Sequence, residues 1–341
     1  MECKNTVISN EQTRTKGRSG KCELKESITA LVRKLGQGLC HPVPYETSWV
    51  ARVPQADNHQ VPAFPLSIQW LRDNQQENGS WGSIQHFSPH SSTLNTLAAV
   101  ICLAQWNNPE DETSIKRGIG ALWDLAKLLP SEKHESIGFE LILPALQSDA
   151  RKYGLDIPHE HYKMYEQKGS RKLKLILSEF KKYGYSRPCT WWHNLEILGE
   201  NLEIIVDDNK IEFSPSMLAN GSVAVSPSAT AYLLRSERLR GKDIPEANDY
   251  LQKMYTLYQG GISQTFPIDI FELAFSVDYF LKAGFSARNP LFNDCIALLS
   301  ERCSPRETVG FSSHSKFPIP TTQPFLCTCY TKQAIKNQWR I

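Results

Sequence analysis

Three groups of acidic or thiol side chains have the residue types that bind metal ions. Carboxylates recur at Glu110–Glu112 and Asp207–Asp208, and two thiols stand one residue apart at Cys327 and Cys329. Carboxylates bind Mg²⁺ and thiolates bind Zn²⁺, but each ion needs more ligands than one such group supplies. The first group follows Pro109, where acids stabilise a helix start. The others lack the further acid, thiol pair or histidine at the required distance, so no metal ion is assignable to this chain.

Histidine offers a different chemistry, because a neutral imidazole can accept a proton near neutral pH. His193 lies in the segment WWHNLEI, and His314 lies in a polar tail with no visible partner. A buried, hydrogen-bonded helix residue explains His193 as well as a base does. Both interpretations of His193 therefore stay open.

The elements expected to position these side chains are helices. Apolar residues recur at helical spacing in Phe64, Ile68 and Leu71, and no segment alternates with the period of a strand. Turns are expected at Asn220–Gly221 and Gly260–Gly261. We therefore predict an all-α fold of paired helices, an α/α-barrel. Further helices are expected at Glu23–Gly36, at Ser92–Gln105 with Ser91 or Ser92 as cap, after Pro109, at Phe139–Ala150 and at Lys168–Lys182.

A turn containing glycine and tryptophan follows the first of these apolar runs. In Gln75-x-x-x-Gly79-x-Trp81, the pair Asn78–Gly79 favours a tight turn because glycine tolerates positive φ. Ser80 can cap the next helix, and Trp81 can cover the end of the preceding helix while its N–H finds a partner. This unit is expected to tie an outer helix to an inner one.

Length, charge and cysteine content limit the class of protein. The chain has 341 residues and a net charge of +2, so we expect two domains and neither nucleic acid nor an anionic membrane as a partner. Its nine cysteines form no pattern, which indicates reduced thiols in a cytoplasmic protein. Residues 1–38 have no apolar signal segment and are expected to be a disordered leader. The longest apolar stretch, Leu94–Ala104, is too short to span a membrane.

Several segments, in order, resemble one enzyme family. YETSWVA and NQQENGSWG are similar to the YDTAWVA and NQxxDGSWG segments of diterpene cyclases, with Glu46, Ser48 and Asn78 as departures. The glutamine–tryptophan unit also resembles a repeat of triterpene cyclases. IGFELILPAL, VSPSATAYLL and YQGGISQTFPIDIFELAFSVDYFLKAGF extend the likeness over roughly Leu39–Phe311. The last of these resembles bifunctional fungal copalyl diphosphate/ent-kaurene synthases most closely.

The resemblance implies a domain plan and a reaction. Residues 39–255 would form an α-barrel γ domain, 256–311 the start of a β domain, and 312–341 an aberrant tail. In complete members, geranylgeranyl diphosphate lies between these domains. An Asp-x-Asp-Asp motif protonates its terminal alkene and yields copalyl diphosphate. Because an alkene is a weak base, that acid must be neutral and desolvated. A further domain would carry a Mg²⁺-dependent lyase activity.

Two residues match the deprotonation end of that reaction by resemblance. In plant relatives, the His of an LHSLEG segment and an Asn before a YPxDLFE segment hold a water that removes the final proton. WWHNLEI places His193 at the first position, and SQTFPIDIFE places Gln264 at the second. Gln264 departs from the family's Asn, which alters this catalytic pair.

The acid motif itself does not occur in the chain. The family carries it shortly after a VGF-like segment, here Val309–Phe311, but a proline- and cysteine-bearing tail without helical pattern follows. Reading the codons of Pro318–Pro324 one nucleotide earlier yields Asp-x-Asp-Asp-Thr-Ala if certain third bases are present. Codons 318, 320, 321 and 323 must end in G, and codon 322 must end in A. We hypothesise that the reading frame breaks between Phe311 and Pro318.

The sequence leads to one functional expectation and two alternatives. We expect the N-terminal part of a class II diterpene cyclase that stops before the acid motif and does not cyclise geranylgeranyl diphosphate by itself. The alternatives are a non-catalytic partner that docks on an intact cyclase and a prenyl diphosphate-binding protein on the same barrel. The oligomeric state is left open.

Overall fold

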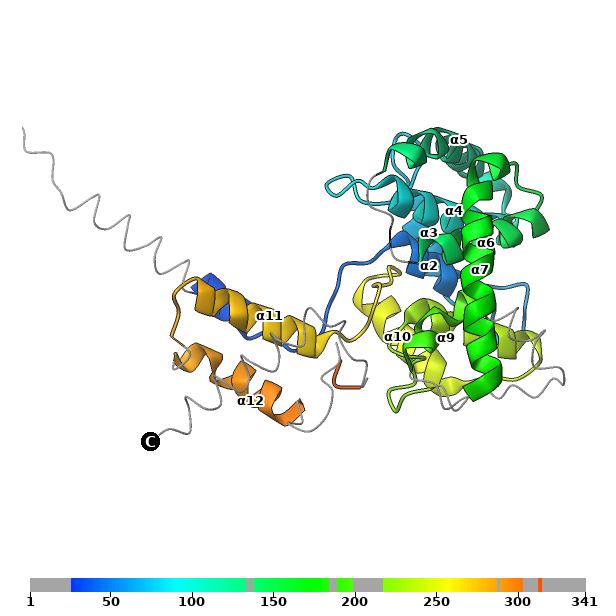
Figure 1. Ribbon diagram of the computed structural model, residues 1–341. Coiled ribbons are helices and arrows are strands. Elements are labelled where there is room, and N and C mark those ends of the chain that lie inside the picture. The colour runs from blue at the N-terminus through cyan, green and yellow to red at the C-terminus, as the bar shows by residue number, and fades with distance from the viewer. Residues whose placement is uncertain are drawn as a thin grey trace, which may run out of the picture. The chain divides into compact units, whose positions relative to one another are not determined.

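The computed structural model describes residues 26–132, 136, 138–183, 189–198, 217–286, 289–302 and 312–314. The chain divides into two compact units, Leu39–Pro267 and a second unit that combines Met1–Gly38 with Ile268–Ile341 (Figure 1). Over the residues described, the structure contains helices and isolated β-bridges but no strand, which confirms the all-α prediction. No helix in that part of the chain has the length and apolar character needed to cross a membrane.

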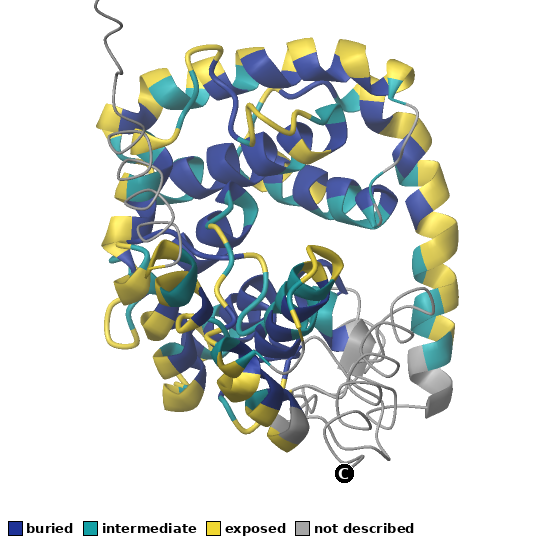
Figure 2. Ribbon diagram, turned by 90° about the vertical axis from the view of Figure 1, so that its left-hand side faces the viewer, coloured by how far each residue is buried: buried dark blue, intermediate teal, exposed yellow. Residues whose placement is uncertain are grey.

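The unit Leu39–Pro267 has inner helices that are buried on most sides and outer helices with one exposed face. Helices α2 and α4 are inner helices that pack against each other, and α2 also packs against α3 and α9. In Figure 2 the buried residues are dark blue and the outer faces yellow. The pairs α4–α5 and α6–α7 are the paired helices that the sequence predicts. The bounds are α2 Pro44–Ala51, α3 Pro65–Asp73, α4 Pro89–Trp106, α5 Glu112–Leu128, α6 Phe139–Lys152, α7 His159–Tyr183, α9 Pro227–Leu239 and α10 Pro245–Leu257.

Proline and serine determine where several helices begin. Proline is at the start of α3, α4, α9 and α10, where its missing N–H breaks no intrahelical hydrogen bond. Ser88 caps α4, because its side chain accepts a hydrogen bond from Ser91 N. The prediction that Ser91 or Ser92 caps this helix is wrong, since Pro89 starts the helix several residues earlier.

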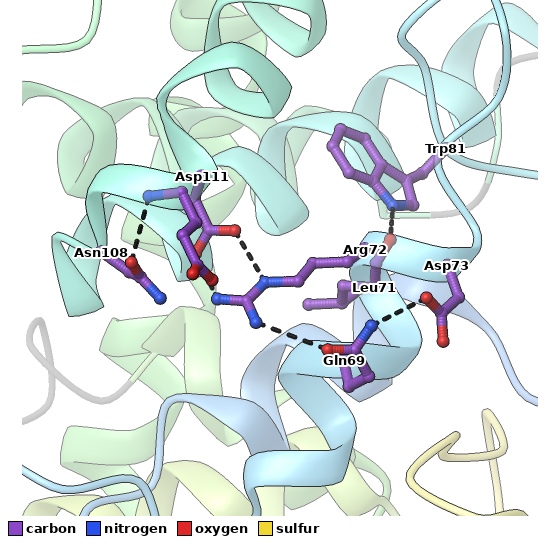
Figure 3. A network of polar contacts seen from close by, with 8 residues as sticks. Gln69, Leu71, Arg72, Asp73, Trp81, Asn108 and Asp111 are labelled. Atoms are coloured by element: carbon purple, nitrogen blue, oxygen red, sulfur yellow. Dashed lines mark hydrogen bonds and ion pairs between the residues drawn. The ribbon is translucent and has the colours of Figure 1, made fainter.

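The tryptophan of the turn after α3 joins an outer helix to an inner one, as the sequence predicts. Trp81 is fully buried, and its Nε1 donates to Leu71 O at 2.8 Å, near the end of α3 (Figure 3). Its backbone N donates to Thr96 Oγ1 of α4 at 3.0 Å. Both the backbone N–H and the indole N–H of Trp81 therefore have hydrogen-bond acceptors within the protein interior.

The glutamine and glycine of the same turn attach it to α5. Gln75 Nε2 donates to Gly79 O and to Ser114 O, both at 2.9 Å. Gly79 has a φ of 84°, and a Cβ atom there would collide with the backbone carbonyl of Arg117. Glycine therefore fits this position on two counts. Ser80 does not cap α4 as expected, because its hydroxyl donates to side chains within the turn.

Two glycines of α5 give a matched test of this packing. A Cβ atom at Gly118 would collide with Val100 Cγ2 and lie 3.0 Å from Trp81 Cζ3, whereas one at Gly120 would meet nothing within 4 Å. We expect Gly118→Ala to lower the free energy of unfolding by ~1–3 kcal/mol through overpacking. We expect Gly120→Ala to raise it by ~0.5–1 kcal/mol, because alanine is the better helix former. Urea unfolding followed by circular dichroism measures both changes. Equal losses of unfolding free energy in the two variants would contradict the close contact of Gly118 with Val100 and Trp81.

The second unit has a hydrophobic core of its own. Helices α11 (Asp269–Lys282) and α12 (Asn293–Arg302) bury apolar side chains together with Val32 from the helical residues 26–32. The core consists of Val32, Leu273, Val277, Phe292, Cys295, Ile296 and Leu299.

The end of the expected leader belongs to this unit. Glu272 of α11 accepts hydrogen bonds from the backbone N of Gly36 at 2.9 Å and of Gly38 at 2.8 Å. The expectation of disorder over residues 1–38 is therefore wrong for residues 26–38, whose apolar side chains pack on α11 and α12. The expected domain boundary at residue 255 also differs from the end of the first compact unit at Pro267.

Candidate functional site

His193 lies on a short helical turn of the unit Leu39–Pro267. The 3₁₀ helix Cys189–Asn194 contains it, and residues 195–198 continue as helix. Its Nδ1 lies 3.1 Å from the backbone carbonyl oxygen of Ala224. Because a carbonyl oxygen only accepts, the ring must donate from Nδ1, and the neutral tautomer has its lone pair on Nε2.

The surroundings keep the His193 ring neutral. Burial lowers the pKa of His193, and the hydrogen bond to Ala224 opposes this effect only in part. A neutral imidazole at pH 7 is the form that can accept a proton. The geometry suits a base, and it suits equally the buried, hydrogen-bonded histidine that the sequence leaves open.

Gln264 lies on the segment that follows α10, with its side chain exposed. Two residues later, Phe266 N donates to Val225 O at 3.1 Å. The carbonyl oxygen of Ala224 accepts from His193, and that of Val225 accepts from Phe266. Adjacent residues of one turn therefore bind both the segment with His193 and the segment with Gln264. The structure thus brings these segments to the same turn, with His193 half-buried and Gln264 exposed. Their catalytic roles stay predictions.

A buried pair of carboxyl groups lies close to this turn, and sequence reasoning missed it. Tyr45 Oη donates to Glu196 Oε1 at 3.1 Å, and Ser228 N at the start of α9 donates to Glu46 Oε2 at 2.8 Å. Both glutamates are 6% exposed, and Glu196 Oε2 is buried with no hydrogen-bond partner among the described residues. Glu46, the one acid in the YETSWVA helix, was the available sequence signal, since a buried acid needs a compensating partner.

Burial raises the pKa of both carboxyl groups of the Glu46–Glu196 pair, and the neighbouring charge adds to the rise at Glu46. Burial raises the pKa of Glu196 to about 7. Burial, and then the neighbouring Glu196 carboxylate, raise the pKa of Glu46 well above its ordinary value. A protonated carboxyl group can donate a hydrogen bond as well as accept one. The pair therefore retains protons at a pH where exposed glutamates are fully ionised.

A cavity of about 360 Å³ lies beside Glu196. Its walls come from α2, α6, α7, α9 and residues 196–198, with Trp49, Tyr232 and Arg235 among the lining side chains. Trp49 Nε1 is buried and, within the described part of the chain, has no hydrogen-bond partner. Charged side chains, Glu140, Asp149, Glu196 and Arg235, share the lining with apolar ones.

The acidic group at Glu110–Glu112 serves the fold. Asp111 is buried and accepts from Arg72 Nε at 2.7 Å and Nη2 at 3.0 Å, a two-point ion pair between η1 (Pro109–Asp111) and α3 (Figure 3). Asn108 Oδ1 accepts from Glu110 N at 3.1 Å and caps the turn. Glu112 pairs with a lysine one turn later in α5.

The described residues do not fit a magnesium site. No group of three His, Cys, Asp or Glu side chains within them could hold a metal ion, and Mg²⁺ prefers several oxygen ligands. Asp207–Asp208 and Cys327–Cys329 lie outside the described residues. No step of the proposed reaction is therefore assigned to a metal held by this part of the chain.

Comparison with known proteins identifies relatives along most of the chain. The ent-kaurene synthase CPS/KS of Physcomitrium patens is 33% identical over 263 residues, which are 76% of this chain and 28% of that protein. The chain spans about a third of the length of the curated relatives it matches. It matches no protein-family model.

Solved structures share the fold. Abietadiene synthase from Abies grandis matches with a TM-score of 0.76 at 25% identity, over 91% of this chain and 39% of that one. The ent-copalyl diphosphate synthase from Arabidopsis thaliana, solved with (S)-15-aza-14,15-dihydrogeranylgeranyl thiolodiphosphate, matches with a TM-score of 0.73 at 27% identity, over 86% of this chain and 40% of that one. The helical arrangement is therefore that of terpene cyclase α-helical domains.

Proposed function

Since this chain is homologous to plant and conifer diterpene cyclases, we propose that it supplies the helical scaffold and the base side of a class II diterpene cyclase. Such an enzyme converts geranylgeranyl diphosphate into copalyl diphosphate by protonating the terminal alkene and removing a proton after ring closure. The observation that carries the proposal is the joint likeness in sequence and fold along most of the chain.

In this proposal His193 is the base. Its neutral ring accepts a proton at Nε2, directly or through one water, and the resulting imidazolium keeps its Nδ1–H bond to Ala224 O. Gln264 is exposed, and its amide group can both donate to and accept from such a water. Burial supports this role, because it keeps the imidazole unprotonated before the reaction.

The acid is proposed to be encoded one nucleotide out of frame after Phe311, since no Asp-x-Asp-Asp occurs in the 341 residues. Sequencing the transcript across codons 311–324 tests this. We expect G as the third base of codons 318, 320, 321 and 323, and A as that of codon 322. Any other third base in codon 318 or 320 would rule out the shifted motif.

Finer assignments rest on the resemblance alone. Similarity to bifunctional fungal synthases, a Mg²⁺-dependent lyase activity in a further domain and a cytoplasmic location stay predictions. The substrate, geranylgeranyl diphosphate, belongs to the same proposal.

A further inference from the structure

Two consecutive buried residues of the site turn adopt a backbone conformation that their side chains disfavour. Ala224 and Val225 both have a φ of 53° and are almost completely buried. A positive φ is uncommon outside glycine, and it is an outlier for a β-branched residue such as valine. Such backbone strain persists only where the surroundings over-determine it, and it gathers at functional sites.

Side-chain hydroxyl groups hold this turn in place. Val223 N donates to Thr230 Oγ1 of α9 at 2.9 Å, and Val225 N donates to Ser222 Oγ at 3.1 Å. Ser222 Oγ in turn donates to Asn220 Oδ1 at 2.7 Å. The hydroxyls of Ser222 and Thr230, called props below, therefore accept hydrogen bonds from the backbone on both sides of Ala224 and fix its conformation.

The consequence of this conformation is the direction of two successive carbonyl groups. Ala224 O accepts from His193 Nδ1 at 3.1 Å, and Val225 O accepts from Phe266 N at 3.1 Å. Rotating either φ to a negative value would turn the carbonyl away from its donor. A glycine-free, strained pair thus holds two segments that lie far apart in the sequence.

We propose that Ala224 and Val225 are positioning residues, whose left-handed backbone fixes His193 in the tautomer with a basic Nε2 and holds the Gln264 segment beside it. Their catalytic meaning rests on the proposed function, but the fixed tautomer is a property of the structure alone. The two residues touch no reacting atom; they act through the imidazole ring and through Phe266. The side-chain hydroxyls of Ser222 and Thr230 are the groups through which this positioning can be released.

The first test uses the unaltered chain labelled with ¹⁵N-histidine. Long-range ¹H–¹⁵N spectra distinguish a protonated ring nitrogen from an unprotonated one, and His193→Gln assigns the signal. We expect His193 to be a single neutral tautomer at pH 7, with Nδ1 protonated and Nε2 unprotonated. A protonated Nε2 with an unprotonated Nδ1, or an even mixture of tautomers, would overturn the proposal.

The second test removes the props. Thr230→Val and Ser222→Ala delete the two hydroxyl groups, and we expect the single tautomer of His193 to be lost or to become a mixture. The matched control is Thr93→Val, which deletes a buried hydroxyl without a hydrogen bond in the described structure; it should leave the spectrum unchanged. Val225→Gly should keep the tautomer, because glycine adopts the same φ without strain.

The outcomes separate this inference from the proposed function. If both prop variants fold by circular dichroism and retain the wild-type tautomer, the positioning claim is wrong whatever the enzyme does. If the tautomer behaves as expected but the protein translated after the one-nucleotide shift does not turn over geranylgeranyl diphosphate, the positioning claim stands and the proposed function fails.

Discussion

Replacing Trp81 by alanine is expected to lower the free energy of unfolding of the Leu39–Pro267 unit by ~3–5 kcal/mol, the usual cost of deleting a buried tryptophan. Trp81 is fully buried in a cluster with Ala51, Ile68, Leu71 and Val100. The change empties this space and also removes the Nε1 donor of Leu71 O. Urea unfolding followed by far-ultraviolet circular dichroism measures the loss.

Trp123→Ala is the matched control for this prediction. Trp123 is 39% exposed on α5, and its Nε1 donates to Asp156 O at a longer distance of 3.3 Å. We expect a loss below ~1 kcal/mol, as for surface substitutions in general. Similar losses for the two tryptophans would mean that the turn after α3 does not tie the helices together.

Glu196 is expected to make stability depend on pH. Its folded pKa of about 7 lies above the ordinary value of 4.5, so the folded state binds more protons than the unfolded state between these values. The stabilising contribution of Glu196 is therefore full below pH 4.5 and is lost as the pH rises towards 7. The size of the loss is ~3 kcal/mol, from about 1.4 kcal/mol per pKa unit. Glu46, whose pKa is also raised, extends the loss to higher pH.

Glu196→Gln tests this pH dependence. Glutamine keeps an oxygen that can accept from Tyr45 Oη but cannot ionise, so the fall in stability between pH 5 and pH 8 should become shallower by ~3 kcal/mol. Glu112→Gln is the control, because Glu112 is exposed and its pKa is lowered by the hydrogen bond to Lys116. Its removal should leave the profile unchanged over this range. Parallel profiles for wild-type and Glu196→Gln would show that the pair is not protonated as described.

Local sequence patterns were sufficient to predict much of the helical scaffold. The spacing of Phe64, Ile68 and Leu71 predicted α3, and the pair Asn78–Gly79 predicted the turn that follows it, because these features act over a few residues. The turn at Asn220–Gly221 is also found, with Gly221 at a φ of 83°. The cap of α4 was predicted wrongly, because Ser80, Ser88, Ser91 and Ser92 are all suitable residues and it is Pro89, at the first helical position, that marks Ser88 as the cap.

The candidate site was predictable only in part. Resemblance indicated His193 and Gln264, but the partner of His193 is a backbone carbonyl, which leaves no mark on the sequence. The left-handed pair at Ala224–Val225 could not be foreseen, because neither residue favours positive φ. The Glu46–Glu196 pair joins residues far apart in the chain, and no local pattern reports such a contact.

Product analysis with geranylgeranyl diphosphate tests the central claim most directly. The 341-residue chain is compared with the protein translated from the same transcript when the frame is shifted one nucleotide between codons 311 and 318. Products are identified by mass spectrometry after removal of the diphosphate. We expect no copalyl diphosphate from the 341-residue chain and copalyl diphosphate from the shifted product. Copalyl diphosphate from the 341-residue chain, or none from the shifted product, would contradict the proposed function.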